Sequence, residues 1–232
     1  MEKRKLQLSG RKEATRNKTT PLVVRFELEE IKQHYTESIK SICKMFAVVD
    51  YLIENNNEEQ AKDIMRSQVV FLVGALDFFM HEITKLGLNK IFNNEWEQTK
   101  KYSHISVPMS VLNHALVEGE DSDWFLEFVN QQFSTVTIVS YESVKDQMNL
   151  LGLNMQSIAD EVFYDINSRE KTIDKLKNRL NGLFNRRNLI AHQLDRKHSN
   201  AEKLDIDRNL VEEFIDDVNH IVDAISKQIS EK

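Results

Sequence analysis

The sequence contains very little cysteine, proline or glycine: its 232 residues include one Cys, two Pro and six Gly. One cysteine excludes an intrachain disulfide framework and any metal site built from several thiolates. Eight Gly and Pro residues in total are too few for an all-β sandwich or barrel, in which turn signals recur every ~8–12 residues. Long hydrophobic runs are also missing. The most apolar stretch, 69–80, includes Asp77 and is shorter than the ~20 residues that a membrane-spanning helix needs.

Charge is distributed unevenly along the chain. The net charge is −6, but residues 1–20 carry seven Lys or Arg and two Glu, a net of +5, so the remainder carries −11. We expect residues 1–20 to be a flexible basic arm, which either serves solubility alone or contacts RNA. The arm lacks the apolar segment of a signal peptide. Together with the single cysteine, this leads us to expect a cytoplasmic protein that is not associated with a membrane.

Apolar residues spaced three and four apart predict four principal helices, at about 26–54, 58–86, 168–191 and 207–229. The second is apolar nearly all round in its middle, which is typical of the central helix of a bundle. Gly74 inside it suggests the close approach of a neighbouring helix, because a helical glycine otherwise costs ~1 kcal/mol. Gly87 is the expected residue after its C-terminus.

The stretch 89–153 is less regular. A short helix capped by Asp121 or Ser122 and a second one at 140–151 are expected within it. The sequence therefore predicts an all-α bundle of four principal helices in residues 21–232, with a partly helical insertion at about 89–153.

An arginine interrupts the apolar stripe of the helix at 168–191. The stripe 173, 176, 180 and 183, continued by the same steps, leads to 187 and 190. Ile190 fits the stripe, whereas Arg187 places a guanidinium on the face that otherwise buries leucines. Such a position is costly unless the charge has a partner or faces a wet cleft. The simplest explanation is that Arg187 reaches solvent along its stem or pairs with an acidic residue of the core.

Two further polar residues follow on the same helix. Asn188 and His192 are four apart and share one face, but Arg187 and His192 are five apart and point roughly 140° away from each other on a regular helix. One helix does not direct both groups at one point unless it bends or ends between them. Two antiparallel copies across a two-fold axis would bring Arg and His from both chains into one cleft.

The surroundings of this motif are basic. Residues 165–197 carry nine Lys or Arg and four acidic residues, a net of +5. A local patch of this kind on an acidic body attracts a phosphate backbone. We expect Arg186, Arg196 and Lys197 to contact RNA.

The string RNLIAH at 187–192 resembles the R-N-x-x-x-H form of the R-x(4–6)-H signature of HEPN domains. The order of the long helices around it is similar to the RiboL-PSP branch of that family. The resemblance implies a homodimeric, metal-independent endoribonuclease without a cofactor, of the kind that often serves as a toxin or antiviral effector in bacteria. Such an enzyme lets the RNA 2′-OH attack the adjacent phosphate, which leaves a 2′,3′-cyclic phosphate and a 5′-OH.

The residue types suit this chemistry. A histidine titrates near neutrality and can act as general base or acid, and an arginine can hold a phosphate while negative charge builds. We predict that His192 transfers the proton, that Arg187 stabilises the transition state, and that Asn188 orients the phosphate or the imidazole. Arg186 is a weaker catalytic candidate, because its spacing to His192 also satisfies the signature.

Two other interpretations stay open. The chain is either a catalytically silent HEPN-like module that binds RNA, a nucleotide or a protein partner, or a plain helical bundle in which the motif is accidental. The sequence contains no P-loop, GxGxxG or GxSxG, so nucleotide hydrolysis, dinucleotide binding and α/β-hydrolase chemistry are not supported. No metal site is expected, since no His, Asp or Glu pair has convincing ligand spacing. An active ribonuclease would need restraint, which suggests a neutralising protein partner.

Overall fold

The computed structural model describes residues 24–118, 123–197 and 199–232. Within these ranges every regular element is a helix, apart from one isolated bridge between Arg196 and Lys203. The all-α fold is therefore confirmed. No helix in these ranges has both the length and the apolar composition needed to cross a membrane. The basic arm and the expected capping residues Asp121 and Ser122 lie outside the described residues.

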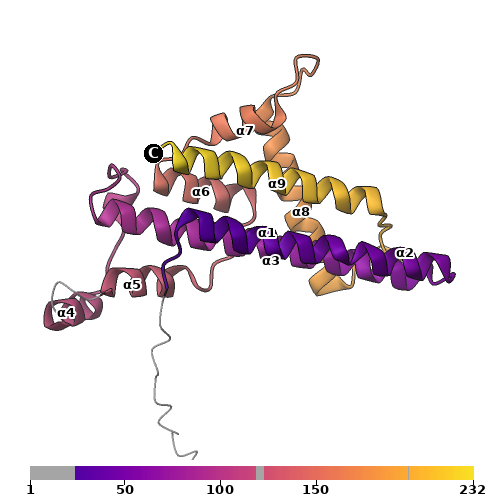
Figure 1. Cartoon of the computed structure of the whole chain (residues 1–232), viewed down its shortest axis with the longest axis horizontal. Coiled ribbons are helices and arrows are strands. Elements are labelled where there is room, and N and C mark those ends of the chain that lie inside the picture. Colours follow the sequence, from indigo (N-terminus) through magenta and orange to yellow (C-terminus); the bar gives the residue numbers. More distant parts are fainter. Residues whose placement is uncertain (1–23, 119–122, 198) are drawn as a thin grey trace, which may run out of the picture.

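Three helices form the long side of the molecule (Figure 1). The chain runs through α1 (Leu28–Lys44) and α2 (Phe46–Glu54), which follow each other almost in line, and returns along them as α3 (Glu58–Phe92). A single helix over 26–54 was predicted, but it is interrupted at Met45. The buried stripe continues across this interruption, which explains why the periodicity did not reveal it: Ile42, Phe46, Val49.

The two glycines of α3 behave differently from the prediction. Gly87 does not end the helix, which continues to Phe92. A Cβ at Gly87 would lie 2.7 Å from a methyl of Leu151 and 2.8 Å from the Trp96 ring, so the missing side chain lets both residues pack against α3. Around Gly74, a Cβ would meet nothing within 4 Å. The neighbouring helix expected there is not supplied by the described part of this chain.

The last two principal helices were predicted within a few residues. They are α8 (Thr172–Gln193) and α9 (Arg208–Ser230). Asp207 begins α9 by accepting a hydrogen bond from the Leu210 N–H at 2.8 Å, the interaction of an N-cap residue. In Figure 1, α9 runs roughly along α1 and α3, whereas α8 crosses them steeply.

The less regular middle of the chain packs on the same core. It forms a short 3-10 turn, Tyr102–His104, and four helices: α4 (Met109–Glu118), α5 (Trp124–Phe133), α6 (Tyr141–Leu151) and α7 (Met155–Phe163). Of these, α6 lies where it was predicted, with Ser140 as N-cap and Gly152 in the left-handed conformation after its end. The helix α7 was not predicted. Buried side chains of α5, α6 and α7 join the cluster that surrounds α3: Phe125, Val129, Met148, Leu151, Ile158.

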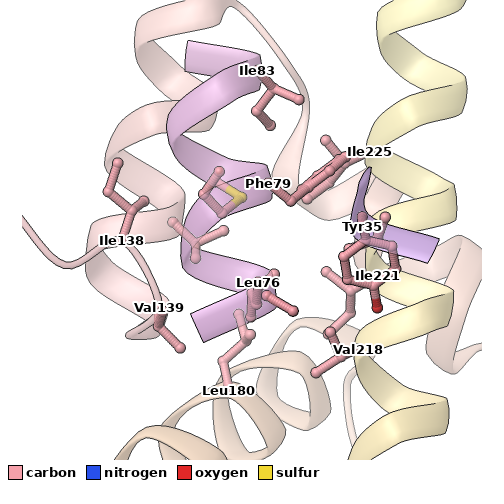
Figure 2. Close-up of a cluster of buried hydrophobic side chains, with 14 of the residues drawn as sticks. Tyr35, Leu76, Phe79, Ile83, Ile138, Val139, Leu180, Val218, Ile221 and Ile225 are labelled. Carbon is pink, nitrogen blue, oxygen red and sulfur yellow. The ribbon is translucent and has the colours of Figure 1, made fainter. Parts of the chain in front are cut away.

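The centre of the core lies where α3 faces α9, α1 and α8 (Figure 2). Phe79 of α3 is fully buried near Tyr35 of α1, with ring centroids 5.8 Å apart, and Leu180 of α8 lies beside Leu76. Burial of each such side chain contributes ~1.5–3 kcal/mol. Because Leu180 belongs to this cluster, the core also sets the position of the motif helix.

Candidate active site

Helix α8 buries one stripe of its first half and presents its second half at the margin of the core. Leu176, Leu180 and Leu183 are at most 2% exposed. One step further along the same stripe, Arg187 is only partly buried. The helix continues without a break to Gln193. The arginine that the stripe singled out therefore lies at the point where α8 leaves the core.

The guanidinium of Arg187 is only partly used within the chain. Its Nη1 donates to Oδ1 of Asn188 at 3.0 Å, and its buried Nε has no hydrogen-bond partner. In the described ranges no carboxylate forms an ion pair with Arg187, so the pairing with an acidic core residue considered from the sequence is not found there. The other terminal nitrogen, Nη2, has no hydrogen-bond partner among the described residues and can donate to an anionic ligand.

Arg187 borders a groove of about 1000 Å³ between α1 and α3. The floor is the outer face of α3, where Phe71 and Phe78 flank Gly74. Phe71 is 55% exposed and Phe78 36%, which is high for aromatic side chains on the central helix of a bundle. His34 of α1 forms one edge, with its ring centroid 6.2 Å from that of Phe78.

The opposite edge of the groove is a loop that two side chains of α3 hold in place. Oδ1 of Asp77 accepts a hydrogen bond from the Ile138 N–H at 2.6 Å. Nε2 of His81 lies 2.8 Å from the Val136 carbonyl oxygen. Between these two residues, Thr137 lines the groove. Asp77 and His81 of α3 thus fix a wall of this groove.

His192 lies in the last turn of α8 and is exposed. Its ring takes part in no hydrogen bond or ion pair with the other residues that the structure describes. Because α8 is regular from Arg187 to His192, the two side chains keep the separation of roughly 140° that five helical positions impose. A single chain therefore does not direct both groups at one point.

Arg186 lies in a buried ion-pair network. Its Nη2 lies 2.8 Å from Oδ2 of Asp195 and 2.7 Å from the carbonyl oxygen of Asp205. Nε of Arg66, from α3, donates to the same Asp195 oxygen at 2.9 Å. Burial lowers the pKa of Arg186, and the Asp195 carboxylate opposes this shift. The expectation that Arg186 contacts RNA does not fit this placement, since its guanidinium joins α8 to the loop before α9.

The other two expected RNA contacts lie on the loop that follows α8. Arg196 and Lys197 are both exposed. Nη1 of Arg196 donates to the Ala201 carbonyl at 2.6 Å, so this side chain partly braces the loop. Lys197 is held through its backbone N–H, which donates to the Glu202 carbonyl at 2.9 Å. Both residues place positive charge within a few positions of His192.

Comparison with known families decides the assignment. The family model described as RiboL-PSP-HEPN matches residues 25–231. The chain belongs to the RiboL-PSP-HEPN family. Comparisons with curated proteins and with solved structures find no match. Since residues 25–231 include α1 to α9, the whole helical assembly is the HEPN domain, and the motif at 187–192 lies on its penultimate helix.

Sequence reasoning missed two residues of this HEPN domain that bear on the site. Asp195 is fully buried and Arg66 is 5% exposed. The two side chains pair with each other, but they are 129 positions apart in the sequence. A charged residue at the start of the apolar run of α3 was the only visible signal for Arg66. Nothing in the local pattern distinguished Asp195 from an ordinary residue of a polar loop. In the described part of the chain, no three His, Cys, Asp or Glu side chains converge into a metal-binding group.

Proposed function

We propose that this HEPN domain is a metal-independent endoribonuclease that works as a homodimer. The observation that carries the proposal is the state of the two motif side chains on α8. Arg187 borders an open groove and pairs with no carboxylate among the described residues, and His192 is exposed without a partner among them. Arginine and histidine suit RNA transesterification, as a phosphate-binding cation and a proton-transfer group.

In this reaction the RNA 2′-OH attacks the adjacent phosphorus and the bond to the 5′-oxygen breaks. The 2′-OH loses a proton and the leaving 5′-oxygen gains one; His192 carries out one of these transfers and solvent the other, while Arg187 neutralises the charge that builds on the non-bridging phosphate oxygens. Asn188 orients the guanidinium of Arg187 through its contact with Nη1, rather than the phosphate or the imidazole directly. Arg196 and Lys197 bind the flanking backbone by their charge. The products are a 2′,3′-cyclic phosphate and a 5′-OH.

A second copy of the chain completes the site. Arg187 and His192 diverge on one regular helix, so a cleft that uses both takes Arg187 from one chain and His192 from its partner. The α3 groove beside Arg187 is the surface for this contact. Its exposed phenylalanines form an apolar surface of the kind that marks a protein–protein contact. The open space at Gly74 allows the α3 helices of two chains to approach closely across a two-fold axis.

We place this activity in a toxin or an antiviral effector. Unrestrained RNA cleavage damages the cell that makes the enzyme, so we expect a neutralising protein partner. The rival function, a catalytically silent module that binds RNA, a nucleotide or a protein, shares the fold and the basic loop. A silent module of this kind needs no contribution from His192, so the effect of His192→Ala on RNA cleavage, given in the first prediction, distinguishes the two functions.

The first prediction concerns RNA cleavage. In buffer with EDTA the protein should fragment a mixed RNA pool, and His192→Ala and Arg187→Ala should each slow cleavage by about 100-fold or more, because each removes a group needed in the transition state. His220→Ala and Arg25→Ala, which change exposed residues of the same types outside the basic stretch 165–197, are the matched controls and should cleave at the wild-type rate. Cleavage that needs added metal, or that survives both motif substitutions, contradicts the mechanism.

The second prediction concerns the shared site. Inactive Arg187→Ala and His192→Ala proteins, mixed and allowed to exchange subunits, should regain about a quarter of the wild-type rate. Random exchange makes half of the dimers mixed, and each mixed dimer has one intact Arg–His pair. Different tags on the two variants verify the exchange. If exchange is complete and the mixture stays inactive, each chain supplies its own pair.

The third prediction concerns the dimer surface. Gly74→Leu should keep or raise the melting temperature of the isolated chain, because a Cβ there meets nothing and glycine is a poor helix former. The same change should fill the groove and convert the dimer to a monomer by analytical ultracentrifugation. Gly182→Leu is the matched control, since Gly182 is also helical with open space around it but does not line the groove. A Gly74→Leu protein that remains dimeric would move the interface elsewhere.

A further inference from the structure

The end of α8 has an uncommon construction. Leu194 and Asp195, the two residues after its last turn, both adopt left-handed backbone angles, with φ of 50° and 61°. Neither is a glycine, the residue that normally occupies this conformation. Such geometry persists only where the surrounding contacts impose it. His192 lies two residues before this turn, so whatever imposes the turn also places the histidine.

Backbone hydrogen bonds to a single carbonyl group end the helix at this turn. The N–H groups of Leu194 and Asp195 both point to the Leu189 carbonyl oxygen, the latter at 3.0 Å. The Asp195 carbonyl in turn accepts a hydrogen bond from the Leu204 N–H at 2.8 Å. The last turn of α8 is therefore tied on one side to its own helix and on the other to the segment that leads into α9.

The Asp195 side chain adds contacts to two other elements. Its Oδ2 lies 2.9 Å from Nε of Arg66 on α3 and 2.8 Å from Nη2 of Arg186 on α8. Arg66 also donates to the Leu204 carbonyl at 2.9 Å, and its third nitrogen pairs with Asp63. The carboxylate is fully buried. A buried charge held by two guanidinium groups fixes position sharply, because a small displacement leaves charges unpaired.

We propose that Asp195, held by Arg66 and Arg186, is a positioning residue for His192; the inference rests on the proposed ribonuclease function. The three side chains do not face the groove or touch the imidazole. They act by fixing the left-handed turn after α8, which sets the direction of its last turn. The clamp, defined as Arg66, Asp195 and Arg186, thus connects the central helix of the core to the proton-transfer group of the site.

The test compares clamp variants by steady-state kinetics and by hydrogen exchange. Asp195→Asn keeps the shape of the side chain but removes its charge, and Arg66→Lys keeps a charge but cannot contact Asp195 and Leu204 together. On an RNA that the wild-type protein cleaves, kcat per folded dimer should fall at least 10-fold while KM stays within about twofold, since binding groups are unchanged. Amides of 189–195 should exchange at least 10-fold faster, with 176–184 unchanged.

Asp205→Asn is the matched control. Asp205 lies in the same loop, pairs with Lys62 at the surface, and meets Arg186 only through its backbone carbonyl, so kcat and exchange should both stay at wild-type values. A folded dimer of either clamp variant with wild-type kcat and wild-type exchange at 189–195 overturns the proposal.

The wild-type protein provides a measurement that does not depend on any variant folding. The amides of Leu194 and Asp195 should be protected as strongly as those of the buried half of α8, and exchange at the rate of an open loop would overturn the clamp. If the wild-type protein cleaves no RNA, the ribonuclease function fails while the exchange data still decide whether the clamp fixes this turn.

Discussion

The buried carboxylate of Asp195 and the three leucines of α8 hold the two ends of the motif helix, and the geometry of the site depends on both. Leu176, Leu180 and Leu183 place the first half of α8 in the core, and Asp195 joins its last turn to Arg66 and Arg186. Between these two attachments the helix is regular. The motif side chains therefore project from a rigid support, as preorganised catalytic groups require.

This arrangement carries energetic costs that the fold has to offset. A left-handed residue other than glycine costs of order 1–3 kcal/mol, and two occur in succession after α8. A buried ion pair contributes little net stability compared with apolar packing, although removal of one partner is strongly destabilising. Gly74 gives up helix propensity although a Cβ there would meet nothing within 4 Å in the described part of the chain. These costs fall at the end of α8 and in the α3 groove, which are the places where we propose the site and the dimer contact.

Local patterns were sufficient to predict the helical class and the motif, but not the contacts made over long distances in the sequence. The apolar stripe of α8 and its interruption by Arg187 follow from a 3.6-residue period, and so does α9. The break in the first helix at Met45 was not predicted, because the stripe of buried residues continues across it. Arg186 was expected to contact RNA, since only the partner across the fold distinguishes a structural arginine from a free one. The groove depends on which face of α3 its neighbours leave uncovered, which periodicity does not reveal.

The most direct test of the account is cleavage of an RNA that carries a single 2′-deoxy substitution at the nucleotide on the 5′ side of the cleaved phosphate. Cleavage by internal attack needs that hydroxyl as the nucleophile, whereas attack by water does not. The account predicts that cleavage in EDTA stops at the substituted position and continues at neighbouring sites, and that the remaining fragments end in a 2′,3′-cyclic phosphate. Cleavage at the substituted position at the normal rate would contradict it.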